Sequence, residues 1–240
     1  MRHSLYKYFD ERQWADAFVE GGLRFRSLSY YRDYEDKNVR GDRNEGTAIY
    51  HPEGGMIVTN HTQGKTSILP YSFQSVANRE EIFVYCLSRS LTDRLSREFK
   101  AVVCIEILNV ERFCTTIEAA LPSGATFPES LGRTRIGHRV EYYRETEGGN
   151  RRWALPDVIA ISKLDSYSWQ DEYRLVFSLT DALGFEKVAT RLVRNDATLA
   201  PQPTEHTHYD VKVRSLRDIC RVHKFRVRTA NGFRIARNAI

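Results

Sequence analysis

The sequence predicts an α+β fold made of short strands with helices between them. Apolar residues make up 41% and aromatic residues 12% of the 240 residues, which is enough to fill a core. Segments with alternating apolar and polar residues are interspersed with segments whose apolar residues recur at helical spacing. No linker-like tract interrupts this pattern. We therefore expect a single domain spanning residues 1–240.

The opening of the chain is expected to form a strand, a helix and a second strand. The aromatic run "SLYKYF" (4–9) is typical of a strand. Asp10 has the chemistry of an N-cap for a helix in "ERQWADAFVE" (11–20), and a glycine pair ends that helix. The alternation in "LRFRSLS" (23–29) then predicts the second strand.

The rest of the chain continues this mixture. Further strands are predicted where apolar, β-branched and aromatic residues gather, at 47–51, 56–60, 81–88, 101–108, 138–143, 172–178 and in the basic C-terminal runs of 211–240. Helices are predicted at 92–100, at 110–121 with Asn109 as cap, and at 156–164. The segments 37–46, 121–132 and 145–152 are predicted to be loops.

The positive charge of the protein is concentrated at its C-terminus. The formal net charge is +5, but residues 211–240 contain nine Lys or Arg and one Asp, a net +8, so the other 210 residues carry −3. This asymmetry suggests nucleic acid or another polyanion as a partner. The candidate contacts are Arg214, Arg226, Arg228 and Arg234. Alternating apolar and basic residues are also typical of strands with one solvated face, and that simpler interpretation is the commoner one.

Several classes of protein are disfavoured by the sequence. It has no apolar run long enough to cross a membrane, and its first residues lack the apolar region of a signal peptide, so we expect a cytoplasmic protein. The four cysteines show no CxxC spacing, which predicts neither a disulfide nor a cysteine-bound metal. His206 and His208 lack a nearby third ligand, so no metal site is predicted. Neither a P-loop nor a Rossmann glycine motif is present.

The run "SWQDEYRLVFS" (168–178) sets a carboxylate at the start of a predicted strand. In an extended conformation Glu172 and Arg174 share one face, and Gln170 falls on the same side. The simplest interpretation is a solvated face on which Glu172 and Arg174 screen one another. The alternative is a functional carboxylate.

The second interpretation gains weight from a resemblance. The tyrosine-rich opening with "LRFRSLSYYRDYED" and "RGDRNEG", together with "RVEYY" and "ISKLDSYSWQDEYRLVFS", resembles a bacterial family of uncharacterised domains grouped with the mono-ADP-ribosyltransferases. The resemblance covers residues 4 to about 50 and 135–178. It implies two facing, mainly antiparallel sheets with peripheral helices and with NAD bound in a central cleft. It also implies a catalytic glutamate at the start of a late strand, here Glu172, and an acceptor-orienting residue two positions earlier, here Gln170.

Other positions follow from the same resemblance. The first strand of the family usually supplies an Arg or His to the dinucleotide. Here the matching stretch offers Lys7, with Tyr8 beside it, which is a departure because lysine lacks the fork of arginine. The second strand usually supplies a Ser or Tyr, for which Ser27 and Tyr30 are the candidates. Arg40, in the glycine-containing loop, is a candidate for the pyrophosphate, although this loop is equally well an ordinary charged turn.

The chemistry expected of Glu172 is general. Breaking the nicotinamide glycosidic bond builds positive charge on the ribose, and a nearby carboxylate stabilises that transition state more than the ground state. The resemblance therefore implies an NAD-dependent ADP-ribosyltransferase, and we expect it to act without a metal. It would be a bacterial toxin or antiphage effector with a macromolecular acceptor, nucleic acid before protein, and its activity would imply an antitoxin or regulatory protein. Two alternatives stay open, namely an NAD glycohydrolase and a non-enzymatic nucleic-acid-binding module.

Overall fold

The computed structural model describes residues 4–33, 42, 44–130, 133–148, 151–195, 206–225, 228, 229, 232 and 233. Its largest sheet has eight strands and is organised around β7 (Ile82–Ser88). Along one edge of β7, the strand β14 (Glu172–Ser178) pairs in antiparallel register over its whole length, and β11 (Gly137–Arg139) extends the sheet beyond β14. The two long strands are rich in the β-branched and aromatic residues that suit a pleated, buried surface.

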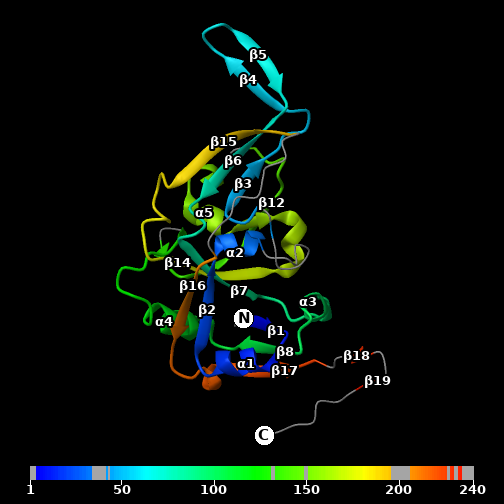
Figure 1. Cartoon of the computed structure of the whole chain (residues 1–240), viewed down its shortest axis with the longest axis vertical. Coiled ribbons are helices and arrows are strands. Elements are labelled where there is room, and N and C mark those ends of the chain that lie inside the picture. The colour runs from blue at the N-terminus through cyan, green and yellow to red at the C-terminus, as the bar shows by residue number, and fades with distance from the viewer. Residues whose placement is uncertain are drawn as a thin grey trace.

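The other edge of β7 is shared by two strands that diverge from each other. β1 (Leu5–Phe9) meets the C-terminal end of β7, and β2 (Gly22–Ser27) meets its N-terminal half. From β1 the sheet continues through β8 (Val103–Ile107) to β17 (Cys220–Lys224), and from β2 to β16 (His208–Lys212). Because β1 and β2 pair with different parts of β7, the sheet is split between them (Figure 1).

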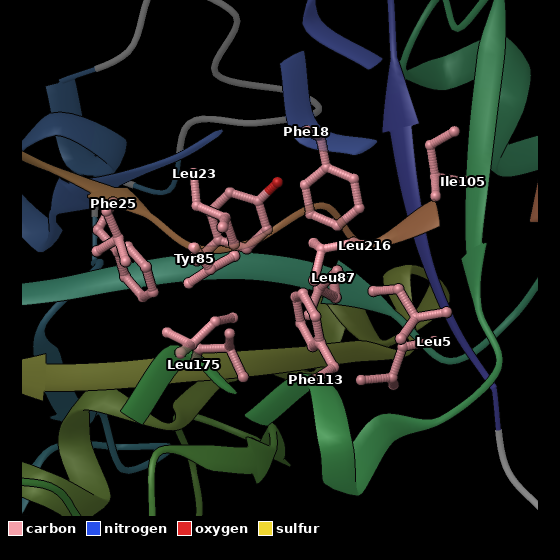
Figure 2. Packing of buried hydrophobic residues seen from close by; sticks show 14 of the residues in the cluster. Leu5, Phe18, Leu23, Phe25, Tyr85, Leu87, Ile105, Phe113, Leu175 and Leu216 are labelled. Carbon is pink, nitrogen blue, oxygen red and sulfur yellow. The ribbon is translucent and has the colours of Figure 1, made fainter. Parts of the chain in front are cut away.

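Two amphipathic helices cover one face of this sheet. They are α1 (Arg12–Val19), which connects β1 to β2, and α4 (Val110–Glu118), which follows β8. Phe18 of α1 and Phe113 of α4 are buried, and each packs with its ring against aromatic or aliphatic side chains of the sheet, as Figure 2 shows. Burying these rings contributes hydrophobic stabilisation to the core between the two helices and the large sheet.

The structure contains a second, smaller sheet, which is joined to the large sheet through a separate core cluster. It has three antiparallel strands in the order β15 (Val188–Arg194), β6 (Tyr71–Ala77), β3 (Thr47–Tyr50). A separate core cluster, which includes Leu28, Val84 and Val176, packs beneath it against the opposite face of the large sheet. Figure 1 shows the smaller sheet above the large one, with the hairpin β4–β5 projecting beyond it.

The remaining elements are short and connect these layers. They are α2 (Leu28–Asp33), β4 (Met56–Asn60), β5 (Lys65–Leu69), α3 (Asp93–Glu98), β9 (Glu129–Ser130), β10 (Arg133–Thr134), β12 (Glu141–Tyr143), η1 (Arg151–Trp153), α5 (Pro156–Ala160), β13 (Ser162–Leu164), η2 (Asp165–Gln170), η3 (Arg217–Ile219), β18 (Arg228–Thr229) and β19 (Gly232–Phe233). Within the described residues β12 and β13 form the one parallel pair. The α+β class predicted from the sequence is therefore confirmed, with sheets that are mostly antiparallel.

The second strand and the helix predicted at 156–164 both give way to a different kind of element before their predicted ends. The second strand stops at Ser27, and Leu28 begins α2 instead of completing a strand to residue 29. Leu28 is the apolar residue that breaks the alternation of the strand, and it is fully buried in the second core cluster. The helix predicted at 156–164 ends at Ala160 and is followed by β13. Short apolar runs of this kind do not distinguish helix from strand by periodicity.

The predicted caps had mixed outcomes. Asn109 caps α4 by accepting a hydrogen bond from Arg112 N at 3.0 Å, as predicted. The prediction of Asp10 as the cap of α1 is wrong, because Glu11 occupies that position and its side chain makes no capping hydrogen bond. The helix is instead held by packing of its buried face.

Candidate functional site

A cleft of about 720 Å³ lies where β1 and β2 separate. Its walls come from β1, β2, α1 and β16, its floor from β7, and its inner end from η2, β13 and β14. A volume of this size is typical of a site for a small molecule or a cofactor. The split in the sheet therefore places a cavity beside the start of β14, where Glu172 lies.

The floor of the cleft is the part of β7 between its two neighbours on this edge. β1 pairs with β7 at Ser88 and β2 pairs with it at Phe83 and Val84, so the strand between these positions faces the split. Lys7 reaches across this opening. Its ammonium donates a hydrogen bond to Cys86 O at 2.8 Å and lies 4.2 Å from the centroid of the Tyr85 ring. The side chain of Lys7 thus donates to a β7 carbonyl that would otherwise bond to the backbone of a neighbouring strand.

Glu172 lies on the wall of the cleft with only 4% of its surface exposed. Its Oε2 accepts a hydrogen bond from Lys163 Nζ at 3.1 Å and its Oε1 accepts one from Arg174 Nε at 2.7 Å. The backbone N–H of Glu172 donates to the hydroxyl of Tyr142 at 2.8 Å. The two cations therefore hold the carboxylate in one orientation, and Tyr142 holds the backbone from which it projects. The interpretation of Glu172 and Arg174 as residues on a solvated face is wrong, because both are buried.

Arg174 extends this arrangement to a second carboxylate. Its two terminal nitrogens donate to the two oxygens of Glu45 at 2.6 and 2.9 Å, and one of them also donates to Ala160 O at 2.7 Å. Lys163, Glu172, Arg174 and Glu45 thus form a buried row in which positive and negative charges alternate. We call this row the charge network. Burying charges is costly, and such a row is tolerated because every member is paired.

The charge network determines the ionisation of Glu172. Burial by itself would raise the pKa of this carboxyl group, but Arg174 and Lys163 outweigh it and hold the pKa well below its usual value. Burial would likewise lower the pKa of Lys163, whereas Glu172 and Glu45 raise it above the usual range. Glu172 is consequently a carboxylate and Lys163 an ammonium across the neutral pH range.

Gln170 lies beside Glu172, but not through the extended backbone that was predicted, because Gln170 is the last residue of the 3₁₀ helix η2. Its Oε1 accepts a hydrogen bond from Lys163 Nζ at 2.9 Å, so the same ammonium orients both side chains. The intervening residue, Asp171, has a left-handed backbone with φ 41°. Its carbonyl accepts a hydrogen bond from Arg89 N at 2.8 Å, and its carboxylate accepts one from Ser90 Oγ. The loop after β7 therefore fixes the turn that brings Gln170 and Glu172 together.

Asp42 is a further buried carboxyl group near the charge network. It is 3% exposed and accepts a hydrogen bond from Asn44 N at 2.9 Å. Burial and the neighbouring Glu45 raise its pKa to about 6, although Lys163 opposes this shift. This carboxyl group consequently titrates close to neutral pH.

The other predicted ligand residues occupy different positions. Tyr8 lines the cleft, but its hydroxyl is engaged by the loop after β7, since it donates to Ser90 O at 2.9 Å and accepts from Thr92 N at 3.1 Å. Ser27 is fully buried with its hydroxyl 2.8 Å from that of Ser29. Tyr30 lies on the cleft wall. Arg40 lies outside the described residues.

The basic C-terminal segment is in contact with acidic residues from other parts of the chain. Arg217 pairs with Glu20, and Arg221 contacts Glu106 at 3.3 Å. Arg214 is exposed. Arg226 and Arg234 lie outside the described residues, as does the side chain of Arg228 in β18. Part of the local positive charge is thus balanced by carboxylates.

Sequence reasoning missed that Lys163, Arg174 and Glu45 form one network with Glu172. One signal was available, because Val176 shares the strand face of Glu172 and Arg174 and predicts that this face is partly buried. The contact with Glu45 joins residues 129 positions apart and has no signature in local sequence.

Comparisons with known proteins add no further assignment. No family model matches the chain, and searches among curated proteins and solved structures find no match either.

Among the described residues there is no cluster of three or more His, Cys, Asp or Glu side chains suited to a metal ion. None of the helices in the described ranges has both the length and the apolar character needed to span a membrane.

Proposed function

We propose that this protein is an NAD-dependent ADP-ribosyltransferase with Glu172 as its catalytic residue. The observation that carries the proposal is a carboxylate with a lowered pKa, fixed by two cations, on the wall of a cleft formed by a split sheet. The large sheet is split where β1 and β2 diverge along β7. This split, together with the second antiparallel sheet, also supports an ADP-ribosyltransferase-like architecture.

The reaction exchanges one bond at the anomeric carbon of the nicotinamide ribose for another. The bond to the nicotinamide nitrogen breaks, its electron pair leaves with nicotinamide, and positive charge develops on the ribose. Glu172 stabilises that charge, and its position is set in advance by Lys163 and Arg174. A lone pair of the acceptor then forms the new bond, and the acceptor releases its proton.

The neighbours of Glu172 have supporting roles. Each carboxylate oxygen has lone pairs beyond the one taken by its cation, so Glu172 can also accept a hydrogen bond from a ribose hydroxyl. Lys163 ties Gln170 to Glu172 and so determines where an acceptor group can lie. Lys7 and Tyr30, which both line the cleft, are the ligand contacts that remain from the residues predicted earlier.

The acceptor and the biological role belong to the same proposal. We favour nucleic acid as acceptor, supported by exposed Arg214 and the net charge of +8 over residues 211–240, with protein as the alternative. An enzyme that consumes NAD or modifies nucleic acid in its own cell suits a toxin or an antiphage effector. That role implies a cytoplasmic location and a neutralising or regulatory protein.

One observation favours hydrolysis as a second candidate function. The amide oxygen of Gln170 already accepts a hydrogen bond from Lys163, which leaves less of this side chain to orient a macromolecular acceptor. Water is small and needs no binding surface for a large acceptor. An NAD glycohydrolase would use the same Glu172 and the same bond cleavage.

The test is incubation with NAD labelled in its adenylate phosphate, in the presence of separated protein, DNA and RNA. Wild-type protein should release nicotinamide, and Glu172→Gln should lower the rate by about 100-fold or more. Glu106→Gln is the matched control, because Glu106 is a buried carboxylate of the same sheet with a lowered pKa but is paired with His223. Thermal melting verifies that both variants fold.

The outcomes separate the candidates. Label on DNA, RNA or protein identifies a transferase and its acceptor. Nicotinamide release without any labelled macromolecule identifies a glycohydrolase. If Glu172→Gln keeps the wild-type rate, the assignment of the catalytic residue is wrong, and if the wild-type protein releases no nicotinamide, the enzymatic proposal fails.

A further inference from the structure

Two arginines of β2, Arg24 and Arg26, lie on the wall of the cleft. Arg26 pairs directly with Val84 of β7, and residues paired in this way project from the same face of a sheet. Cys86, two positions further along β7, lies on that face too and pairs with Arg174. Both arginines of β2 therefore project from the face of the sheet that carries the charge network.

The two guanidinium groups differ in what they contact. Arg24 is held by Asp210, whose two oxygens accept hydrogen bonds from its Nε and Nη2 at 2.7 and 2.8 Å. The guanidinium carbon of Arg26 instead lies 4.5 Å from the centroid of the Tyr30 ring. A cation–π contact of this kind uses the charge of the guanidinium and none of its N–H donors. Arg26 thus presents hydrogen-bond donors on the wall of the cleft.

Lys7 approaches the same opening from β1. Because Tyr6 pairs with Ser88, Lys7 projects from the opposite face of the sheet, where its ammonium lies against the Tyr85 ring and donates to the carbonyl of Cys86. Of Lys7 and Arg26, it is therefore Arg26 that shares a face with the charge network.

We infer that Arg26 binds the pyrophosphate of the dinucleotide, and that the Tyr30 ring holds Arg26 in position for it. The identity of the ligand rests on the proposed function. A planar fork matches two phosphate oxygens at once, whereas an ammonium acts as a point charge. Arg26 therefore supplies on the second strand the forked donor that lysine at position 7 does not supply on the first. Arg217 is the comparison, because its fork is occupied by Glu20 and neither residue lines the cleft.

The inference is tested first by binding, which requires no turnover. ADP, which carries the two phosphates without nicotinamide, is titrated calorimetrically into wild-type protein, Arg26→Met and Arg217→Met. We expect Arg26→Met to weaken binding about tenfold or more, since a charge-assisted contact is lost, and Arg217→Met to change it less than about twofold. Equal affinity of the wild-type protein and Arg26→Met, or failure of the wild-type protein to bind ADP, overturns the inference.

A kinetic measurement separates this inference from the proposed function. Arg26→Met should raise the KM for NAD about tenfold and leave kcat within about threefold, because the pyrophosphate is remote from the bond that breaks. If NAD is consumed in a Glu172-dependent way but the KM is unchanged in Arg26→Met, the function stands and the inference fails. If ADP binding depends on Arg26 but NAD is never cleaved, the anion site stands and the proposed reaction fails.

Discussion

Glu172 and Arg174 lie on the same face of β14 with the carboxylate Oε1 and the guanidinium Nε 2.7 Å apart, and both side chains are shielded from solvent. Arg174 contacts Glu45 through its remaining nitrogens, so one guanidinium neutralises two buried carboxylates. The same contacts that orient Glu172 for chemistry are therefore also structural. Removing them is expected to affect stability as well as activity.

The first prediction concerns Arg174→Met. This change leaves Glu172 and Glu45 buried without their shared cation, and uncompensated buried charges typically cost about 3–5 kcal/mol of unfolding free energy. Urea denaturation of the variant measures this loss. Arg112→Met is the control, because Arg112 pairs with Asp218 at the surface, where such a pair contributes at most about 1 kcal/mol. Similar losses in the two variants would contradict the structural role of the charge network.

A second prediction follows from the raised pKa of Asp42. In the unfolded chain this carboxyl group ionises near its usual pKa of 3.8, whereas in the folded protein it ionises near 6. The folded state therefore binds the extra proton between these values, and this residue makes the protein less stable as the pH rises from about 4 to about 6. The shift corresponds to a loss of up to about 3 kcal/mol.

The corresponding measurement is the unfolding free energy of wild-type protein and Asp42→Asn at several pH values. Asparagine keeps an oxygen for the hydrogen bond from Asn44 N but does not ionise. The unfolding free energy of Asp42→Asn minus that of the wild type should therefore be larger at pH 7 than at pH 4. A constant difference between the two proteins across this range would show that Asp42 does not titrate as inferred.

Much of the fold follows from local patterns in the sequence. Alternation over residues 172–178 correctly placed Glu172 and Arg174 on one face, and the polar side chain of Asn109 correctly marked the start of a helix. Such features depend only on neighbours within a few residues. The class of fold and many of the strands were predictable for the same reason.

The site was only partly predictable, because its contacts join distant segments. The resemblance associated Gln170 with Glu172, but the sequence predicted neither the turn at Asp171 that brings them together nor the lysine ammonium that binds both of them. The divergence of β1 and β2 along β7 is likewise a property of strand pairing. Alternation identifies the buried face of a strand but not the strand that will pair with it.

A third prediction concerns the close approach at Gly21, which ends the α1 region. Its φ is 86°, and a β-carbon built there would lie 2.3 Å from Val213 O in the segment after β16. Gly21→Ala should therefore both strain the backbone and force the two segments apart, with a loss of about 2 kcal/mol or more in unfolding free energy. Gly124→Ala is the control, since nothing lies within 4 Å of its added carbon. An equally small loss in both variants would show that the segments move apart freely.

The last prediction concerns Asp171 as a positioning residue between Gln170 and Glu172. Its left-handed backbone, with φ 41°, suits Asp, Asn or Gly better than other residues. Its carboxylate also accepts the hydrogen bond from Ser90 Oγ and contacts Arg89. Asparagine retains both the backbone preference and an acceptor, glycine retains only the backbone preference, and alanine retains neither.

The three variants should therefore rank Asn, Gly, Ala in both unfolding free energy and kcat for NAD cleavage. We expect Asp171→Asn to stay within about 1 kcal/mol of wild type, and Asp171→Ala to lose about 1–3 kcal/mol through strain and lost hydrogen bonds. A role in positioning predicts that kcat of the folded Ala variant falls while its KM changes little, because Glu172 moves relative to the reacting bond. Wild-type kcat in Asp171→Ala would restrict Asp171 to a structural role, and a rank with Ala above Asn would contradict the backbone argument.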